Sequence, residues 1–308
     1  MVLADPLSMR IRLRIRLERK PAPSQLVRSA NENSDLSRVL PHRLTGTVVL
    51  NPGSKNESSG TFAAYRDRDQ YRSDIAISGQ HRTWLRLGNK VYISDSSPVA
   101  FLGLEKFKDI ENAWRESRAD DHDMKFSRVT RKKNLGADVW CMNANYRDFT
   151  PWRLCFDRAR GLMVTNGYDQ DLYEFSDFQA IGGQQYPGQI RRIKQGKVVL
   201  EVRNLRAQLG PVPQSTFEIP QAARMFETCD NMVDPKLIFE PELFPHAYST
   251  SNESIRLFIY GIVDPDGSFG NVHAASVPRD PTIVKLVEEA ASKRRYSPAR
   301  CGSKADDA

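Results

Sequence analysis

Short runs of alternating apolar and polar residues recur along most of this chain, and their spacing constrains the fold more than any other feature. Between Leu44 and Pro220 such runs begin about every 8–12 residues and are separated by turn-forming residues. A period of two places one row of side chains on each face of a strand. The pattern predicts a meander of antiparallel strands at 44–50, 61–66, 71–77, 81–87, 91–94, 137–142, 152–156, 162–165, 173–181, 189–193, 198–205 and 216–219.

One segment, at residues 98–117, interrupts the meander. Five of its residues share helical spacing and predict a short amphipathic helix: Leu104, Phe107, Ile110, Glu111 and Trp114. A long meander with one or two helices is typical of a strongly curved, unclosed barrel. We therefore expect an α+β, mainly β fold, with a curved antiparallel half-barrel domain at 38–225 and a smaller domain at 228–308.

The four cysteines are Cys141, Cys155, Cys229 and Cys301, and none belongs to a CxxC motif or to a cluster with zinc-ligand spacing. Cys141 and Cys155 fall near the middle of neighbouring predicted strands, so we expect them to form a disulfide. We expect a second disulfide between Cys229 and Cys301, at the two margins of the smaller domain. Two disulfides indicate an oxidising compartment. The alternative is four unrelated buried thiols in a cytosolic protein.

The positive charge of the chain is concentrated at its start. The net charge is +7, and residues 1–20 hold six basic and two acidic side chains, which leaves +3 for all the rest. A body so close to neutral does not indicate a nucleic-acid partner. We interpret 1–37 as a disordered basic head and linker, because it has too little apolar surface to offset its ordering entropy, and we expect 1–35 to be dispensable for folding. The alternative is an arm that contacts acidic lipid or nucleic acid.

The segment Ser254–Pro298 has a different order of elements. An alternating run at 255–263 is followed by Asp-Pro-Asp-Gly at 264–267, which is typical of a tight hairpin turn, and then by a second strand at about 268–275. Asp280 and Pro281 provide an N-cap and a first helical position. The predicted helix has one apolar face and is followed by a basic, aromatic and proline-containing ending, Arg294-Arg295-Tyr296-Ser297-Pro298-Ala299.

This order of elements resembles the C-terminal domain of TonB-type energy transducers, over about residues 235–301. Arg295 stands where the family commonly has tryptophan, and the family's last strand is missing from the pattern after Ala299. The resemblance implies that the domain recognises an outer-membrane transporter peptide, or another β-strand, by pairing along an exposed sheet edge. It assigns partner contacts to Ile255, Leu257, Ile259, Arg295, Tyr296 and Pro298. Without the last strand, we expect an open edge that dimerises, binds a partner strand or weakens the domain.

The preceding domain is similar to carriers of the LolA, outer-membrane-lipoprotein-sorting type. The likeness rests on the order of short motifs, from Gly60-Thr61-Phe62 through Cys141 and Cys155 to Tyr186-Pro187. It implies an unclosed barrel around an apolar groove that holds an acyl chain or another apolar ligand.

The sequence contains no recognisable catalytic set. G-x-S-x-G, P-loop and HExxH motifs are absent, and the five histidines are scattered. The cluster Asp120-Asp121-His122-Asp123 has ligands that suit a divalent cation, but consecutive loop residues rarely converge on one centre, and we interpret it as a solvated turn. We expect no enzyme activity, no cofactor and no metal.

Two functions from different classes remain. The first is a periplasmic TonB-like binding protein in energy-coupled transport across the outer membrane, and the second is a periplasmic lipid or lipoprotein carrier. A groove lined by Leu, Ile, Phe, Met and Trp favours the carrier, whereas converging histidines and carboxylates would favour a hydrolase. Both functions place the chain in the periplasm or cell envelope, although no signal peptide and no run of the ~20 apolar residues that span a bilayer is visible.

Overall fold

The computed structural model describes thirteen segments of the chain: residues 20–95, 110–116, 122–134, 137–146, 150–168, 170–221, 223–227, 232–233, 235–242, 256–264, 266–277, 280–298 and 300–301. Within them, no helix has the length and hydropathy needed to span a membrane.

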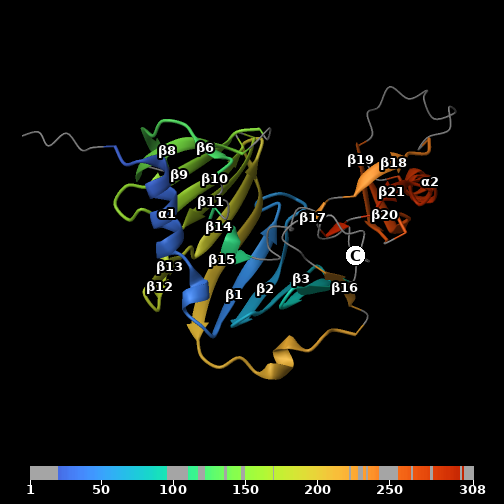
Figure 1. Cartoon of the computed structure of the whole chain (residues 1–308), viewed down its shortest axis with the longest axis horizontal. Helices are drawn as coiled ribbons and strands as arrows, with labels where there is room; N and C mark the ends of the chain where they lie inside the picture. Colours follow the sequence, from blue (N-terminus) through green and yellow to red (C-terminus); the bar gives the residue numbers. More distant parts are fainter. Residues whose placement is uncertain are drawn as a thin grey trace, which may run out of the picture.

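A curved antiparallel sheet forms most of the described structure (Figure 1). Its order is β16-β5-β4-β3-β2-β1-β15-β14-β11-β10-β9-β8-β6, with β7 also paired with β8. The strands are β1 His42–Leu50, β2 Ser58–Asp67, β3 Gln70–Ile77, β4 Gln80–Leu87, β5 Lys90–Asp95, β6 Met124–Phe126, β7 Thr130–Asn134, β8 Ala137–Tyr146, β9 Trp152–Asp157, β10 Met163–Tyr168, β11 Asp171–Ser176, β14 Gln189–Lys194, β15 Lys197–Leu209 and β16 Arg224–Glu227. The expected mainly β fold with a curved antiparallel meander is confirmed.

Two-residue turns set the register of several hairpins. Ser78 and Gly79 have φ values of 50° and 76° and join β3 to β4 directly after the pair Ile77 and Gln80. Two consecutive residues with positive φ form the turn whose twist matches that of paired strands. The strands β12 (Gln179–Ile181) and β13 (Gln184–Tyr186) form a separate small hairpin.

The sheet has one apolar face, which we call the inner face. Alternate residues of successive strands lie on it, as in β8 and β9, where Trp140, Met142, Leu154 and Phe156 join the main hydrophobic cluster. That cluster continues across β1, β2, β3, β10, β11, β14 and β15. We call the opposite face the outer face.

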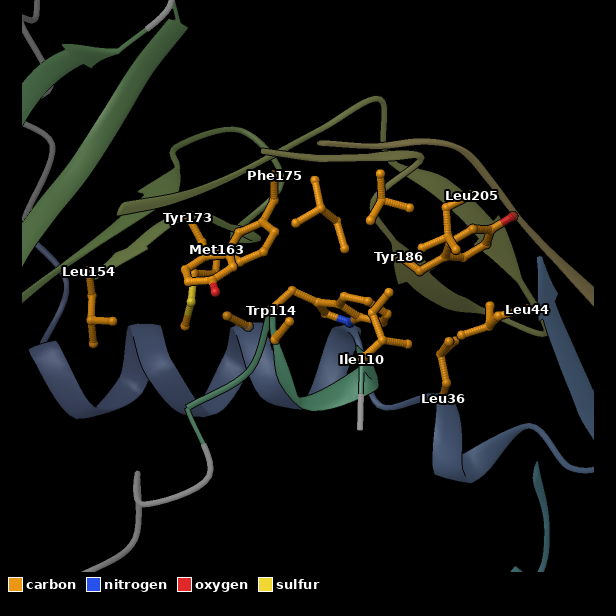
Figure 2. Close-up of a cluster of buried hydrophobic side chains, with 14 of the residues drawn as sticks. Leu36, Leu44, Ile110, Trp114, Leu154, Met163, Tyr173, Phe175, Tyr186 and Leu205 are labelled. Atoms are coloured by element: carbon orange, nitrogen blue, oxygen red, sulfur yellow. The ribbon is translucent and has the colours of Figure 1, made fainter. Parts of the chain in front are cut away.

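Helix α1 (Pro23–Asn33) lies against the inner face, below the strands in Figure 2. Its residues Leu26, Val27 and Ala30 are buried in the main cluster, and the short 3-10 helix η1 (Leu36–Arg38) adds Leu36. The expectation that residues 1–37 form a disordered head and linker is therefore wrong for 23–37. Three apolar residues at helical spacing suffice to dock this polar-looking helix, because the sheet supplies the rest of the apolar surface. Residues 1–19 lie outside the described part of the chain.

The segment 110–116 also covers the inner face, next to α1. It begins with one 3-10 turn at 110–112 and continues in turns, so this part is not the regular amphipathic helix expected from its spacing, and residues 96–109 lie outside the described part. Ile110, Ala113 and Trp114 are nevertheless buried in the main cluster, as their spacing suggested.

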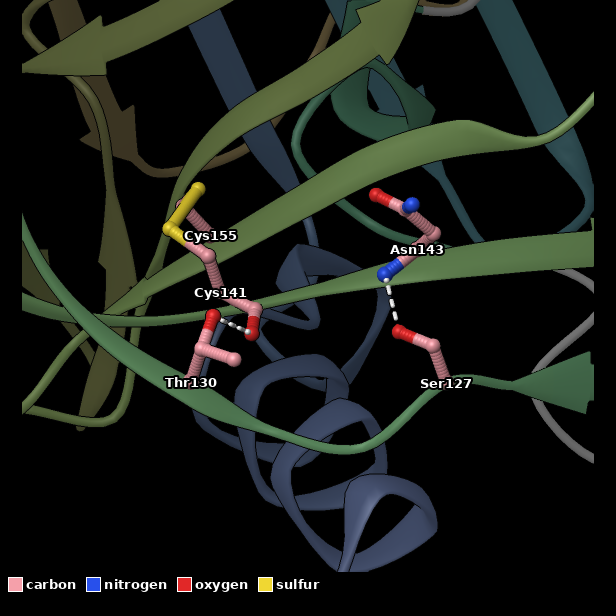
Figure 3. Close-up of a disulfide and its surroundings, with 5 residues drawn as sticks. All are labelled: Ser127, Thr130, Cys141, Asn143 and Cys155. Atoms are coloured by element: carbon pink, nitrogen blue, oxygen red, sulfur yellow. Dashed lines mark hydrogen bonds between the residues drawn. A yellow bond between two sulfur atoms is a disulfide. The ribbon is translucent and has the colours of Figure 1, made fainter.

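A disulfide joins Cys141 of β8 to Cys155 of β9, which are direct partners in the antiparallel register (Figure 3). This confirms the first expected disulfide. Both cysteines lie on the outer face in a small cluster with Val139 and Val164, apart from the main core. Cys229 lies outside the described residues, so the second expected disulfide stays a prediction.

The segment 210–221, which we call the strap, follows β15 and brings the chain back across the sheet. Its 3-10 helix η4 (Gln214–Phe217) lies against β3, where Arg72 Nη1 donates a hydrogen bond to the carbonyl oxygen of Thr216 at 2.9 Å. The strap then continues into β16, which pairs with β5 at one edge of the sheet.

The remaining elements form a smaller module, of which Figure 1 draws β19, β20 and α2 apart from the large sheet. Strands β19 (Arg256–Val263) and β20 (Phe269–Val277) form a hairpin, and helix α2 (Pro281–Ala291) packs across it through Ala274, Ile283 and Val287. The strands β18 (Lys236–Phe239) and β21 (Arg295–Ser297) pair, as do β17 (Met232–Val233) and β22 (Arg300–Cys301). The predicted hairpin and helix are present, including the N-cap, since Asp280 Oδ1 accepts from the Thr282 and Ile283 amides.

The expectation that no strand follows Ala299 needs correction, because the two-residue strand β22 lies directly after it. The strand β21 lies between α2 and Ala299 and contacts the hairpin through a β-bridge between Ser268 and Arg295. The turn residue Gly267 fixes this contact, because its carbonyl oxygen accepts a hydrogen bond from the Tyr296 amide at 2.8 Å. Residues 302–308 lie outside the described part.

Candidate functional site

The inner face of the large sheet is the best candidate site, because it is the broad apolar surface that a half-barrel offers to a ligand. It is not an open groove in this structure. Ile110 and Trp114 from the segment 110–116, which we call the plug, fill the space between the sheet and α1 (Figure 2). Trp114 is only 1% exposed, and its ring nitrogen donates to the carbonyl oxygen of Ser34 at 3.3 Å.

A buried charged cluster fastens the first end of the plug to the sheet. Glu111 lies 3.0 Å from His42 Nε2 and 2.9 Å from Arg66 Nε, through its two carboxylate oxygens. The other ring nitrogen of His42 lies 2.7 Å from the carbonyl oxygen of Val39, so both ring nitrogens have a polar neighbour. Arg66 also stacks over the Tyr71 ring at 4.6 Å, and the Tyr71 hydroxyl accepts from the Ile110 amide.

Burial and charge act in opposite directions on Glu111. Burial alone would raise the pKa of this carboxyl, but the hydrogen bond from His42 and the charge of Arg66 hold that pKa below its ordinary value of 4.5. The carboxylate is therefore charged at neutral pH inside the core. A charge in this place is stable only while both basic partners remain beside it.

The second end of the plug is fastened to α1 and to β9. The Asn31 side chain both donates to the Glu116 carbonyl at 2.9 Å and accepts from the Glu116 amide at 3.0 Å. Trp152 Nε1 donates to the Glu116 carboxylate at 3.2 Å. Arg115 Nη1 lies 2.9 Å from Asp35, directly before η1. Polar contacts thus hold both ends of the plug while apolar side chains fill its middle.

No sequence motif indicated a functional role for His42, Arg66, Glu111 or Glu116. A usable signal was present for one of them, since Glu111 interrupts an otherwise apolar set of residues at helical spacing. A carboxylate on the apolar side of a segment requires a buried partner. The partner itself is not visible in the sequence, because His42 is 69 residues away.

The residues assigned to partner binding in the small module are only partly gathered together. Leu257 and Ile259 pack against α2 and its cluster, so they face the interior of the module. Arg295, Tyr296 and Pro298 lie in or directly after β21, where Tyr296 contacts the Phe269 ring at 5.3 Å. Ile255 lies outside the described residues.

The acidic cluster expected to be a solvated turn is described only at its end. His122 is 90% exposed and its Nε2 lies 3.1 Å from Asp123 Oδ1, while Asp120 and Asp121 lie outside the described part. Among the described residues, no group of three or more His, Cys, Asp or Glu could hold a metal ion. A shallow pocket of about 200 Å³ does occur on the outer face near Arg43 and Tyr65, beside the end of β15 and the residues 210–213 that follow it.

No protein-family model and no curated protein sequence matches this chain. Among solved structures, the chain is similar to a LolA superfamily protein from Nitrosomonas europaea, with 12% identity, a TM-score of 0.41, and coverage of 65% of this chain and 98% of that chain. It is also similar to a DUF1329 family protein from Desulfovibrio piger, with 14% identity, a TM-score of 0.44, and coverage of 63% and 96%.

A third likeness extends over more of the chain. The MucA/MucB complex structure from Pseudomonas aeruginosa matches with 12% identity and a TM-score of 0.28, and it covers 82% of this chain and 74% of that chain. All three TM-scores are below 0.5, so these likenesses do not establish a family for this chain. None of them is to a TonB-type protein.

Proposed function

We propose that this protein carries an acyl-chain-like apolar ligand in the periplasm or cell envelope, on the inner face of its large sheet. One observation supports this above all: side chains from outside the sheet, Ile110 and Trp114, seal a broad apolar face that displacement of the plug would expose. A lipid chain that covered the same face would replace their contacts. The disulfide between Cys141 and Cys155 suits an oxidising compartment.

The polar contacts of Glu111 and Glu116 favour a plug that can leave the inner face over one that covers it permanently. A buried ion pair loses the hydration of both charges, and apolar residues of similar volume often stabilise a core at least as well. A plug that only had to complete the core would not need Glu111 and Glu116. A plug that opens, in contrast, benefits from side chains that are readily hydrated once they leave the sheet.

The test is binding of a fluorescent fatty acid to the full chain. We expect saturable binding to the wild-type protein. The variant Glu111→Ala should bind about tenfold more tightly, because weaker fastening lowers the free energy needed to expose the inner face. Circular dichroism before each titration establishes that the variant is folded under the conditions used.

The matched control is Glu218→Ala, which removes the same functional group from an exposed position of the strap. It should leave fatty-acid affinity unchanged. The proposal is contradicted if neither the wild type nor folded Glu111→Ala binds the probe saturably, or if the two bind it equally well.

A second candidate function is partner binding by the small module, in the TonB-like sense of pairing with an added strand. Among the described residues, β19 pairs only with β20, which leaves its other edge open. The strand β18 in addition exposes three consecutive apolar side chains, Leu237, Ile238 and Phe239. Open strand edges and exposed apolar patches both favour association with another chain, including a second copy of this one.

Hydrogen exchange on the full chain tests this second candidate. In dilute monomeric protein, the amides of β19 that point away from β20 should exchange quickly, and they should become protected when a partner strand or a second copy binds. Strong protection of those amides in a monomer, confirmed by sedimentation, would show that the edge is already covered.

A further inference from the structure

The edge of the large sheet opposite β16 carries a concentration of positive charge. This edge consists of β6 and β7, which pair in succession along β8, with Met124 opposite Tyr146 and Thr130 opposite Cys141. No strand among the described residues pairs with the other side of β7. Among the described residues, its outward backbone groups thus have no strand partner, and unpaired strand edges tend to recruit another chain.

The segment 124–134 contains no acidic residue. It places five exposed basic side chains along this edge: Lys125, Arg128, Arg131, Lys132 and Lys133. Arg131 pairs with Asp138 at 2.6 Å, but Arg158 shares the same carboxylate at 3.0 Å. Within the described chain, no ion pair neutralises Lys125, Arg128 or Lys132. The edge thus has a clear excess of positive charge, although the body of the protein is close to neutral.

The cations lie on both faces of the edge. Residues directly opposite one another in an antiparallel pair share a face. Lys132 is opposite Val139, on the outer face near the disulfide, whereas Arg131 and Lys133 are opposite Trp140 and Asp138, on the inner face. A flat membrane surface could contact only one of these rows. A chain that pairs alongside β7 would place its own side chains beside both.

The edge is also rigidly supported. The disulfide links β8, the strand on which β7 lies, to β9, and the Thr130 hydroxyl donates to the carbonyl oxygen of Cys141 at 3.1 Å (Figure 3). Farther along, Ser127 and Asn143 exchange two hydrogen bonds, of 2.8 and 2.9 Å. A preorganised strand loses little conformational entropy when a partner binds to it.

We infer that the β7 edge is a docking strand for an extended, acidic segment of a partner polypeptide. Lysines on edge strands commonly prevent sheets from pairing with one another. The same side chains select by charge, because they repel a basic strand, gain no charge attraction from a neutral one, and attract one that carries Asp or Glu on both faces. This inference does not depend on the proposed carriage of an apolar ligand.

The experiment uses the full chain and a fluorescein-labelled peptide rich in glutamate and valine, with glutamates at both odd and even positions. A second peptide has glutamine in place of every glutamate, and a third has proline at alternate positions, which removes backbone donors. We expect saturable binding of the first peptide, weaker binding at high salt, and at least about tenfold weaker binding of each altered peptide.

Two variants with equal loss of charge locate the site. Neutralising the edge with Lys125→Gln, Arg128→Gln, Lys132→Gln and Lys133→Gln should weaken peptide binding by at least about tenfold. Neutralising four exposed lysines elsewhere, with Lys55→Gln, Lys90→Gln, Lys194→Gln and Lys197→Gln, should leave it unchanged.

Four outcomes would overturn the inference. The first three are no saturable binding of the acidic peptide, equally tight binding of the acidic and proline peptides, and an equal loss of affinity in the edge and control variants. The fourth is that the wild type binds vesicles containing anionic lipid but not the peptide, and that the edge variant no longer binds these vesicles. The last outcome would identify a membrane as the partner of this edge.

Discussion

His42 Nε2 lies 3.0 Å from Glu111 Oε1, and the two side chains are only 1% and 3% exposed. With Arg66, they form a charged cluster inside the hydrophobic core, where ions are costly unless each has a partner. This cluster joins β1 and β2 to the plug. Its strength therefore governs how firmly the inner face of the sheet stays covered.

Glu111→Ala should reduce the free energy of unfolding by about 3–5 kcal/mol, because it leaves two basic groups buried without their shared carboxylate. The exposed control Glu218→Ala should change it by no more than about 0.5 kcal/mol. Urea denaturation followed by circular dichroism measures both. Similar stabilities for the two variants would mean that the cluster contributes little to the closed state.

The contribution of Glu111 should also depend on pH. Its pKa is lowered in the folded protein, so the stabilisation is complete above the unfolded value of 4.5 and is lost as the pH falls through the lower folded value. Glu111→Gln cannot titrate, so the stability difference between wild type and this variant should shrink as the solution is acidified below pH 4.5. Urea denaturation at a series of pH values measures that difference, and a constant difference would contradict the prediction.

Helix α1 should be essential to the fold. Val27 is fully buried on the inner face, whereas Gln25, two residues earlier, is exposed. We expect Val27→Asp to unfold the protein or detach the helix, because it places a carboxylate in the apolar core. Gln25→Asp, in the same helix, should be tolerated. Thermal melting compares them, and equal melting temperatures would show that the helix is dispensable.

Removal of the disulfide should destabilise the large sheet. The two cysteines are 14 residues apart, and closing a loop of about this size stabilises by roughly 3 kcal/mol in the chain-entropy model. The double variant Cys141→Ala and Cys155→Ala should unfold at correspondingly lower urea concentration. Reduction of the wild type should reproduce the effect, and the double variant should be insensitive to reductant. Unchanged stability in both cases would contradict this.

The turn between β19 and β20 should not tolerate a side chain. Gly267 has a φ of 80°, and a Cβ there would overlap the carbonyl oxygen of Tyr296. Gly79 has a similar φ of 76° but open space around it, so Gly79→Ala should cost only about 1–2 kcal/mol. Gly267→Ala should cost more and should accelerate exchange of the amides in β20 and β21. Equal effects of the two substitutions would show that the contact with β21 is unimportant.

Local sequence patterns predicted much of the fold, because strands, turns and helix caps depend on interactions between residues that are close in the chain. Alternation with a period of two identified most strands of the large sheet, and the hairpin, capped helix and turn of the small module followed from Asp-Gly, Asp280 and Pro281. The pairing of Cys141 with Cys155 was predictable for the same reason, since only a short loop separates their strands.

The candidate site was less predictable. The resemblance to a half-barrel led us to expect an apolar groove, but whether that groove is open depends on which segment packs into it. The basic edge at β7 was also missed, although the run from Lys125 to Lys133 without an acidic residue was visible in the sequence. The sequence does not show that this basic run forms an edge strand, and only the position of β7 in the sheet indicates a binding role for it.

The sequence by itself determined most of the strands, many of the turns between them, the first disulfide and the hairpin with its helix, because each of these depends on residues close together in the chain. Only the tertiary structure decided that β1 pairs with β15, that α1 joins the core, and that Glu111 is buried beside His42 and Arg66. These relationships join segments far apart in sequence, and their free energy comes from mutual burial and charge pairing, which leave no periodic trace in either segment alone.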